Sequence, residues 1–182
     1  MVNLAGLFMD FCEHLDGKLQ WSKTKGSDWT ELIFKFFVEK ATVWEATSKS
    51  EYLTIDLIWR NFLQDIVLAV EHEGAHKNVI KILDEEMLHL IDLRASAKVG
   101  IFYLSEADES TLIRNLRQRL AARQIKLDEQ YMVIIGRSTR RQGKPSILFR
   151  RHLLGNTGKD IEPSEDIVIS QKPKTLEKQS EG

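Results

Sequence analysis

Three carboxylates near two apolar stretches of the sequence could form a cation site. Asp56 lies inside residues 52–59 (YLTIDLIW), and Glu71 and Glu73 follow residues 66–70 (IVLAV). Both stretches have the composition of strands, and the short connection between them predicts an antiparallel hairpin. Because side chains alternate along a strand, Glu71 and Glu73 are expected to share a face.

The register of this hairpin decides whether the carboxylates meet. A turn centred between Phe62 and Leu63 pairs Asp56 with Ala69, one diagonal step from Glu71. A shift of two residues would place Asp56 directly opposite Glu71, and a shift of one residue would separate them.

Carboxylates held this close repel one another unless something compensates their charge. A hard divalent cation such as Mg²⁺ would remove the repulsion, because it binds carboxylates together with waters and substrate phosphates. Such an ion can activate water for phosphodiester cleavage. The alternative is that Glu71 and Glu73 form ion pairs with Lys or Arg at a strand end, and the residues alone leave both interpretations open.

The arrangement of these stretches resembles the PD-(D/E)XK nuclease superfamily. The resemblance lies in YLTIDLIW, IVLAVEHE and LIDLRASAKVGIFY, and it covers about a third of the chain. It implies a restriction-endonuclease-like fold and a metal-dependent endonuclease that hydrolyses DNA phosphodiesters. It also implies that Asp56 and Glu71 hold Mg²⁺ or Mn²⁺, with Glu73 at the position of the family's lysine as a further metal or catalytic group.

Glu73 departs from the family pattern, because a lysine normally stands there. Some restriction endonucleases of the superfamily carry Glu at this position, and Lys77 could supply the basic group from four residues further on. The departure also supports an alternative, a catalytically inactive module that binds nucleic acid or protein. The Pro before the Asp is replaced by Ile55. A further carboxylate from the N-terminal region could complete the site: Glu31, Glu39 or Glu45.

The same segment contains a zinc-peptidase motif, H-E-x-x-H, at residues 72–76. On a helix, His72 and His76 would bind Zn²⁺ and Glu73 would act as the base, with Glu85 or Glu86 as a third ligand. The β-branched residues before the motif and a glycine within it favour a strand instead. The remaining histidines are assigned to the surface or the core: His14, His89 and His152.

Residues 114–151 contain eleven Lys or Arg and two acidic residues, although the whole chain has a net charge of −1. This basic stretch predicts a nucleic-acid surface, and neutralising six phosphates would give a log–log salt slope of about −5. A solvated charged face is an equally good interpretation. The candidate nucleic-acid-binding residues are Arg114, Arg117, Arg137, Arg140, Arg141 and Lys144.

Hydrophobic periodicity predicts a mixed α/β domain with a hairpin at its core and helices on both faces of the sheet. The domain is expected to span residues 1–154, with residues 1–27 as an N-terminal helical extension and residues 155–182 as a polar, flexible tail. The expected helices are residues 4–19, 28–40, 77–94 and one capped by Ser110. The further strands are residues 99–104, 131–136 and 146–153, with a basic loop at residues 137–145.

Composition limits the remaining possibilities. The chain has 182 residues, of which 42% are apolar, and its single cysteine, Cys12, excludes an intramolecular disulfide framework. The longest uncharged run is nine residues (1–9), which predicts neither a membrane span nor a secretory signal. A reducing, cytoplasmic setting is expected, and the oligomeric state, including a homodimer, is left open.

Overall fold

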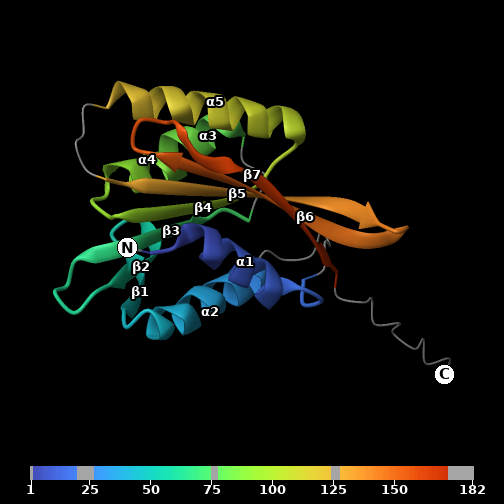
Figure 1. The fold of residues 1–182 in the computed structure, drawn as a ribbon, viewed down its shortest axis with the longest axis horizontal. Coiled ribbons are helices and arrows are strands. Elements are labelled where there is room, and N and C mark those ends of the chain that lie inside the picture. The colour runs from blue at the N-terminus through green and yellow to red at the C-terminus, as the bar shows by residue number, and fades with distance from the viewer. Residues whose placement is uncertain (1, 20–26, 75–77, 124–127, 172–182) are drawn as a thin grey trace.

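A seven-stranded sheet with helices on both faces organises the chain in the computed structural model (Figure 1). The structure describes residues 2–19, 27–74, 78–123 and 128–171. The strands are β1 (Thr47–Tyr52), β2 (Ile55–Arg60), β3 (Ile66–His72), β4 (Ala97–Tyr103), β5 (Gln130–Arg141), β6 (Lys144–Gly155) and β7 (Asp160–Ser170). The helices are α1 (Leu4–Leu15), α2 (Ser27–Val43), α3 (Val79–Lys81), α4 (Met87–Asp92) and α5 (Glu106–Ala122), with the π-helical turn η1 (Ile82–Glu86) between α3 and α4.

The strands follow their sequence order across the sheet, and β3, β4 and β5 are parallel. The other neighbouring pairs are antiparallel. The mixed α/β class is therefore confirmed. Because parallel strands run in one direction, the carboxyl ends of β3, β4 and β5 lie at the same edge of the sheet.

Alternation along the strands divides the core between two faces. Leu68 and Val70 of β3 pack in the cluster that includes α1 and α2, whereas Ala69 packs in the cluster with α4 and α5. Figure 1 shows α1 and α2 below the sheet and α3, α4 and α5 above it. Glu71 has the same parity as Ala69, so it belongs to the α4 face.

The N-terminal helix is part of this core rather than an extension of it. Leu4, Phe8 and Phe11 are buried among residues of α2 and of the sheet. The Phe11 ring makes an edge-on contact with Phe149 of β6, with centroids 5.4 Å apart. Residues 1–27 are helical as expected over Leu4–Leu15, but α1 folds as one layer of the domain.

The expectation of a flexible tail from residue 155 onward is wrong for Asp160–Ser170, which forms β7 along β6. This strand has few apolar residues, and charge pairs hold it in place. Arg150 pairs with Asp166 at 2.6 Å, and Arg151 pairs with Glu162 at 2.8 Å. The rest of the expected tail, residues 172–182, lies outside the described residues.

Two local expectations also need correction. Residues 137–145 are not a loop but the end of a β5–β6 hairpin, which turns at Gln142 and Gly143, both with positive φ. Helix α5 begins at Glu106 instead of after Ser110, because Ser105 caps it by accepting the Asp108 N–H at 3.2 Å.

In the described part of the chain, no helix is both long and apolar enough to cross a membrane.

Candidate metal centre

Asp56 and Glu71 face each other across β2 and β3. The register pairs Leu57 with Val70 and Ile58 with Ala69, so the next pair in the same sequence is Asp56 with Glu71. Directly opposite residues project to the same face, with Cβ atoms about 5 Å apart. The Asp56 side chain also accepts the His72 main-chain N–H at 2.8 Å, which anchors it at the end of β3.

This register lies two residues from the one expected for a turn centred at residues 62–63. The turn is closed by the Asn61 N–H donating to the Asp65 carbonyl at 3.1 Å, and Gln64 within it has φ 66°. A bulge between Trp59 and Arg60 adds the second residue of the shift. Together, the turn and the bulge place Asp56 directly opposite Glu71 instead of diagonal to it.

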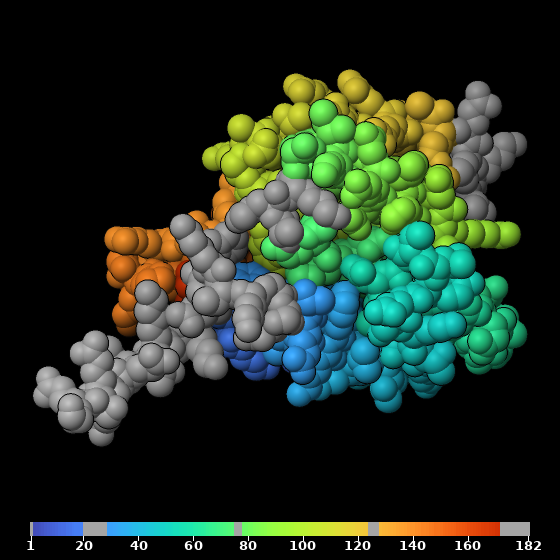
Figure 2. Space-filling model, turned by 180° about the vertical axis from the view of Figure 1, so that it is seen from behind, coloured from blue at the N-terminus to red at the C-terminus, as the bar shows by residue number. Residues whose placement is uncertain are grey.

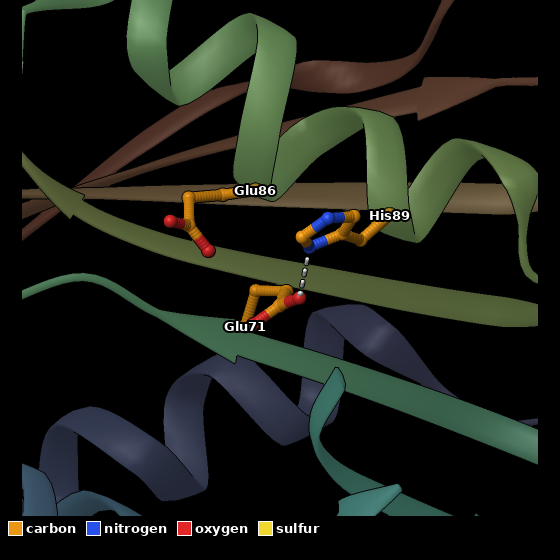
Figure 3. Close-up of side chains that lie close together, drawn as sticks. All are labelled: Glu71, Glu86 and His89. Atoms are coloured by element: carbon orange, nitrogen blue, oxygen red, sulfur yellow. Dashed lines mark ion pairs between the residues drawn. The ribbon is translucent and has the colours of Figure 1, made fainter. Parts of the chain in front are cut away.

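Helix α4 and the turn before it close the site from above. Ligand atoms of Glu71, Glu86 and His89 all lie within 4.8 Å of one another. The Glu71 Oε1 is 3.5 Å from the His89 Nδ1 (Figure 3). Figure 3 shows the Glu86 and His89 side chains pointing down from the helix toward Glu71 on β3. The three groups come from segments that meet only through tertiary packing.

Local backbone features bring this helix over Glu71. Glu86 and His89 are three residues apart, so they share one helix face. The π-helical turn Ile82–Glu86 ends at Glu86, with the Met87 N–H bonded to the Ile82 carbonyl, and such insertions are frequent at functional sites. In the sheet, Gly100 pairs with Glu71, and a Cβ there would lie 2.6 Å from the Phe102 ring and 3.1 Å from the Met87 Sδ, so the glycine makes room for both side chains. The glycine therefore allows α4 to pack closely beside Glu71.

Burial makes Glu71 chemically unusual. The side chain is 1% exposed, and burial together with the adjacent Asp56 carboxylate raises the pKa of Glu71 to about 9. The Glu71 Oε1 and the His89 Nδ1 are buried atoms without a hydrogen-bond partner. Buried polar atoms of this kind are costly unless a ligand satisfies them. The donor set of carboxylates and imidazole fits a divalent cation.

The pKa of Glu71 predicts a measurable pH dependence of stability. The unfolded chain ionises Glu71 near its usual pKa of 4.5, whereas the folded protein keeps the proton up to about pH 9. In chelator, the wild-type free energy of unfolding should therefore fall from pH 7 to pH 9 relative to Glu71→Gln, by at most about 1.4 kcal/mol per pH unit. Urea unfolding at each pH measures this difference. Glu13→Gln, an exposed change on α1, should track the wild type, and parallel curves for wild type and Glu71→Gln would contradict the prediction.

The structure does not place the other expected basic and acidic residues among the three close groups Glu71, Glu86 and His89. Glu73 follows β3, half-buried, with its N–H donating to the Ile101 carbonyl at 3.1 Å, and it is not one of the three mutually close groups. Lys77 lies outside the described residues. Lys98 of β4 shares the face of Glu71, but its Nζ is 2.7 Å from Glu129. Lys98 is therefore already committed to a buried ion pair.

The zinc-peptidase motif does not have the helical context that it requires. His72 is the last residue of β3, and its ring lies on the opposite face of the sheet from Glu71. There the ring contacts the Thr30 Oγ1 at 3.3 Å and the Tyr103 hydroxyl at 3.1 Å. Burial lowers the pKa of His72 to about 4. His76 lies outside the described residues.

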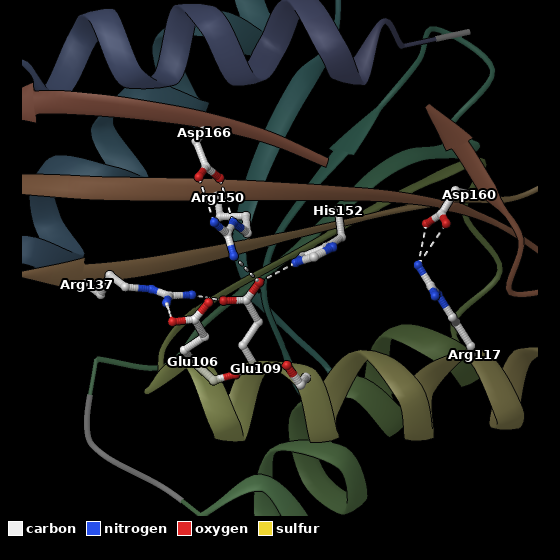
Figure 4. A network of polar contacts seen from close by, with 9 residues as sticks. Glu106, Glu109, Arg117, Arg137, Arg150, His152, Asp160 and Asp166 are labelled. Carbon is white, nitrogen blue, oxygen red and sulfur yellow. Dashed lines mark hydrogen bonds and ion pairs between the residues drawn. The ribbon is translucent and has the colours of Figure 1, made fainter. Parts of the chain in front are cut away.

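Most arginines of the basic stretch are paired within the protein. Arg117 donates two hydrogen bonds to Asp160, and Arg137 pairs with Glu106 and Glu109 of α5 (Figure 4). Four further arginines have acidic partners as well: Arg119 with Asp84, Arg123 with Glu129, Arg150 with Asp166 and Arg151 with Glu162. Arg117 and Arg137 are therefore weaker candidates for nucleic-acid contact than the sequence suggests. His152 also lies in this network, 2.7 Å from Glu109, so it is not an isolated histidine.

The remaining basic candidates are exposed. Arg140, Arg141 and Lys144 lie at the tip of the β5–β6 hairpin, and Arg114 lies on α5. Within the ranges that the structure describes, none of these four forms a salt bridge. The hairpin continues β5 beyond the edge where β3 and β4 end, and Figure 2 shows its atoms (orange) projecting from one side of the molecule.

His89 and Glu86 are the residues that the sequence interpretation missed at this site. The sequence alone places His89 on the surface or in the core, and it offers Glu86 only as a zinc ligand beside His72 and His76. The available signal was Glu86-Met87-Leu88-His89, a Glu-x-x-His spacing that metal-binding helices also use.

Comparison with known proteins does not identify the chain. No protein-family model matches it, and no curated protein matches it. Among solved structures, the central domain of yeast acetyl-CoA carboxylase is similar at 12% identity with a TM-score of 0.44. The similarity covers 76% of this chain and 24% of that chain. At this level it indicates neither a fold family nor an activity.

Proposed function

We propose that the protein is a metal-dependent nuclease that hydrolyses DNA phosphodiesters. The observation that carries the proposal is the direct opposition of Asp56 and Glu71 on one face of the β2–β3 hairpin. Asp56 is half-buried and Glu71 is fully buried. The pair lies at the edge of the sheet beyond which the basic β5–β6 hairpin extends. The unpartnered Glu71 Oε1 supports a cation as the missing partner.

The order of elements supports the same proposal. Helix α2 is followed by the meander β1–β2–β3, a helical segment and the parallel strand β4. The part of this order that the resemblance to the PD-(D/E)XK superfamily implies is a strand with the Asp, a short turn, a strand that ends in Glu-x-Glu, a helix and a further strand. A restriction-endonuclease-like architecture is therefore part of the proposal, whereas the mixed α/β sheet is the observed fold.

In this proposal Asp56 and Glu71 hold Mg²⁺ or Mn²⁺, which would polarise the scissile phosphate and activate water. Glu73 would bind a second ion or orient the attacking water, and Lys77 is a candidate auxiliary base. Asp56 is held in place by the His72 N–H, so its orientation does not depend on the ion. A cytoplasmic location and a homodimer stay predictions.

The proposal is tested by incubating the protein with single-stranded, duplex and branched DNA and with RNA, in Mg²⁺, Mn²⁺ or chelator. We expect metal-dependent cleavage of DNA by the wild type and by Asp128→Asn, an exposed control. Loss of cleavage in Glu71→Gln would agree with the proposal. Cleavage that persists in Glu71→Gln, or that is absent with both metals, would contradict it.

A second candidate function is a catalytically inactive module that binds nucleic acid. The observation that favours it is that the basic group of the family is missing from the site. Glu73 stands at the position of the family's lysine, and Lys98, which lies on the same face of the sheet as Glu71, is buried in an ion pair with Glu129. DNA binding without cleavage in any metal would select this alternative.

The corrected basic surface gives a prediction for DNA affinity. Replacing Arg140, Arg141 and Lys144 together by Gln should weaken DNA binding and reduce the log–log salt slope by about 3, because three exposed cations are lost. Fluorescence anisotropy at several salt concentrations measures both quantities. Arg117→Gln is the matched control, since its charge is already neutralised by Asp160. An unchanged slope in the triple variant would show that the hairpin does not contact DNA.

A further inference from the structure

We infer that Glu71, Glu86 and His89 form a mixed carboxylate–imidazole centre that binds a first-row transition metal ion, with Mn²⁺ as the representative, in preference to Mg²⁺. This inference deepens the proposed function, because it shares Glu71 with the proposed nuclease site. Its test depends on metal binding and not on cleavage.

The geometry needs little rearrangement to bind one ion. Ligand atoms that share an ion at about 2.1 Å lie about 3–4 Å from one another. The Glu71 Oε1 and His89 Nδ1 are already 3.5 Å apart, and all three ligand atoms lie within 4.8 Å. Because Glu86 and His89 share one helix face, a small rotation of their side chains brings both toward Glu71.

The burial of the donor atoms indicates that a ligand belongs between them. The Glu71 side chain is 99% buried and its Oε1 has no hydrogen-bond partner, and the His89 Nδ1 is likewise buried and without one. An ion pair at 3.5 Å is too long to satisfy either atom as a hydrogen bond would. A cation bound by both atoms removes this cost.

The imidazole decides which class of ion is favoured. Mg²⁺ prefers oxygen ligands and keeps several waters, whereas imidazole suits first-row transition metals. Carboxylates alone would accept either class. A single histidine among them therefore shifts the preference toward ions such as Mn²⁺, Fe²⁺ or Zn²⁺.

The experiment measures Mn²⁺ binding to the full chain by electron paramagnetic resonance of the free ion, with Mg²⁺ as competitor. We expect at least one bound Mn²⁺ that only an excess of Mg²⁺, about tenfold or more, displaces. Broadening of the His89 ring proton signals by Mn²⁺, with the His14 signals unaffected, gives a second measurement that needs no variant. Displacement by equimolar Mg²⁺, or the absence of bound Mn²⁺, would overturn the inference.

Variants separate the imidazole from the carboxylates. His89→Gln should lower Mn²⁺ affinity about tenfold or more, since changing even a supporting partner of a metal ligand costs this much, and should leave Mg²⁺ affinity within about twofold. His14→Gln, on α1 beneath the opposite face of the sheet, should change neither. Wild-type Mn²⁺ affinity in His89→Gln would overturn the inference even if the protein cleaves DNA. Intact Mn²⁺ binding without any cleavage would instead reject only the nuclease function.

Discussion

Asp56→Asn should abolish metal-dependent cleavage, reducing it about 100-fold or more, while leaving the metal-free protein as stable as the wild type or more stable by about 0.5–2 kcal/mol. The first effect follows if Asp56 is a metal ligand. The second follows because the Asp56 charge adds to the burial that raises the pKa of Glu71, and the substitution removes that charge without changing the shape of the side chain.

The surroundings of Asp56 explain why Asp56→Asn should not destabilise the metal-free protein. In the part of the chain that the structure describes, no Lys or Arg forms a salt bridge with Asp56, and its side chain accepts a hydrogen bond from the His72 N–H. An Asn oxygen can accept the same bond. An aspartate held by a cation would behave in the opposite way, because its removal would leave that cation unpaired.

Thermal unfolding of wild type and Asp56→Asn, in chelator and in excess Mg²⁺ or Mn²⁺, measures the effect. The wild type should gain stability from the metal according to mass action, and Asp56→Asn should gain much less. Asp128→Asn is the matched exposed control. A variant that is markedly less stable in chelator, together with a wild type that does not respond to metal, would refute the assignment of Asp56.

Lys98→Met should destabilise the protein by about 3–5 kcal/mol, which is the largest stability effect that we expect from a single change. Lys98 is fully buried, and its Nζ is 2.7 Å from the Glu129 Oε2 and 3.0 Å from the Tyr131 hydroxyl. Burial lowers the pKa of Lys98, and the Glu129 carboxylate opposes this shift. Methionine fills a similar volume but leaves the carboxylate without its main charge partner.

A double-mutant cycle separates the lost charge pair from lost packing. Lys98→Met with Glu129→Met removes both charges, and it should cost less than the sum of the single changes by about 1–3 kcal/mol. Urea unfolding of the four proteins measures the coupling. Strictly additive costs would show that Lys98 acts through packing alone.

The hairpin illustrates how far the sequence could predict the site. Alternation and the short connection predict that Asp56 and Glu71 share a face, and the structure places them together. The register could not be predicted, because it depends on the positive φ of Gln64 and on the bulge at Trp59 and Arg60. Each feature shifts the pairing by one residue, and a single shift would have separated the carboxylates.

Other features depended on contacts that periodicity does not encode. His89 lies eighteen residues after Glu71, on a helix whose position over β3 depends on the small Gly100 and on the π-helical turn. Similarly, β7 has the composition of a tail, and its pairing is stabilised by Arg150 and Arg151, which the sequence shows only as members of the basic stretch 114–151. Local composition cannot distinguish a cation that binds a ligand from one that binds the protein itself.

The internal pairing of these arginines changes the electrostatic potential that the protein exerts on a distant polyanion. An ion pair such as Arg117–Asp160 acts at long range as a dipole, and its potential decays faster with distance than that of a single charge. The charges at the hairpin tip, Arg140, Arg141 and Lys144, act as separate monopoles, screened over about 8–10 Å. Diffusional encounter with a polyanion is therefore directional, because the hairpin tip attracts it before the internally paired arginines do.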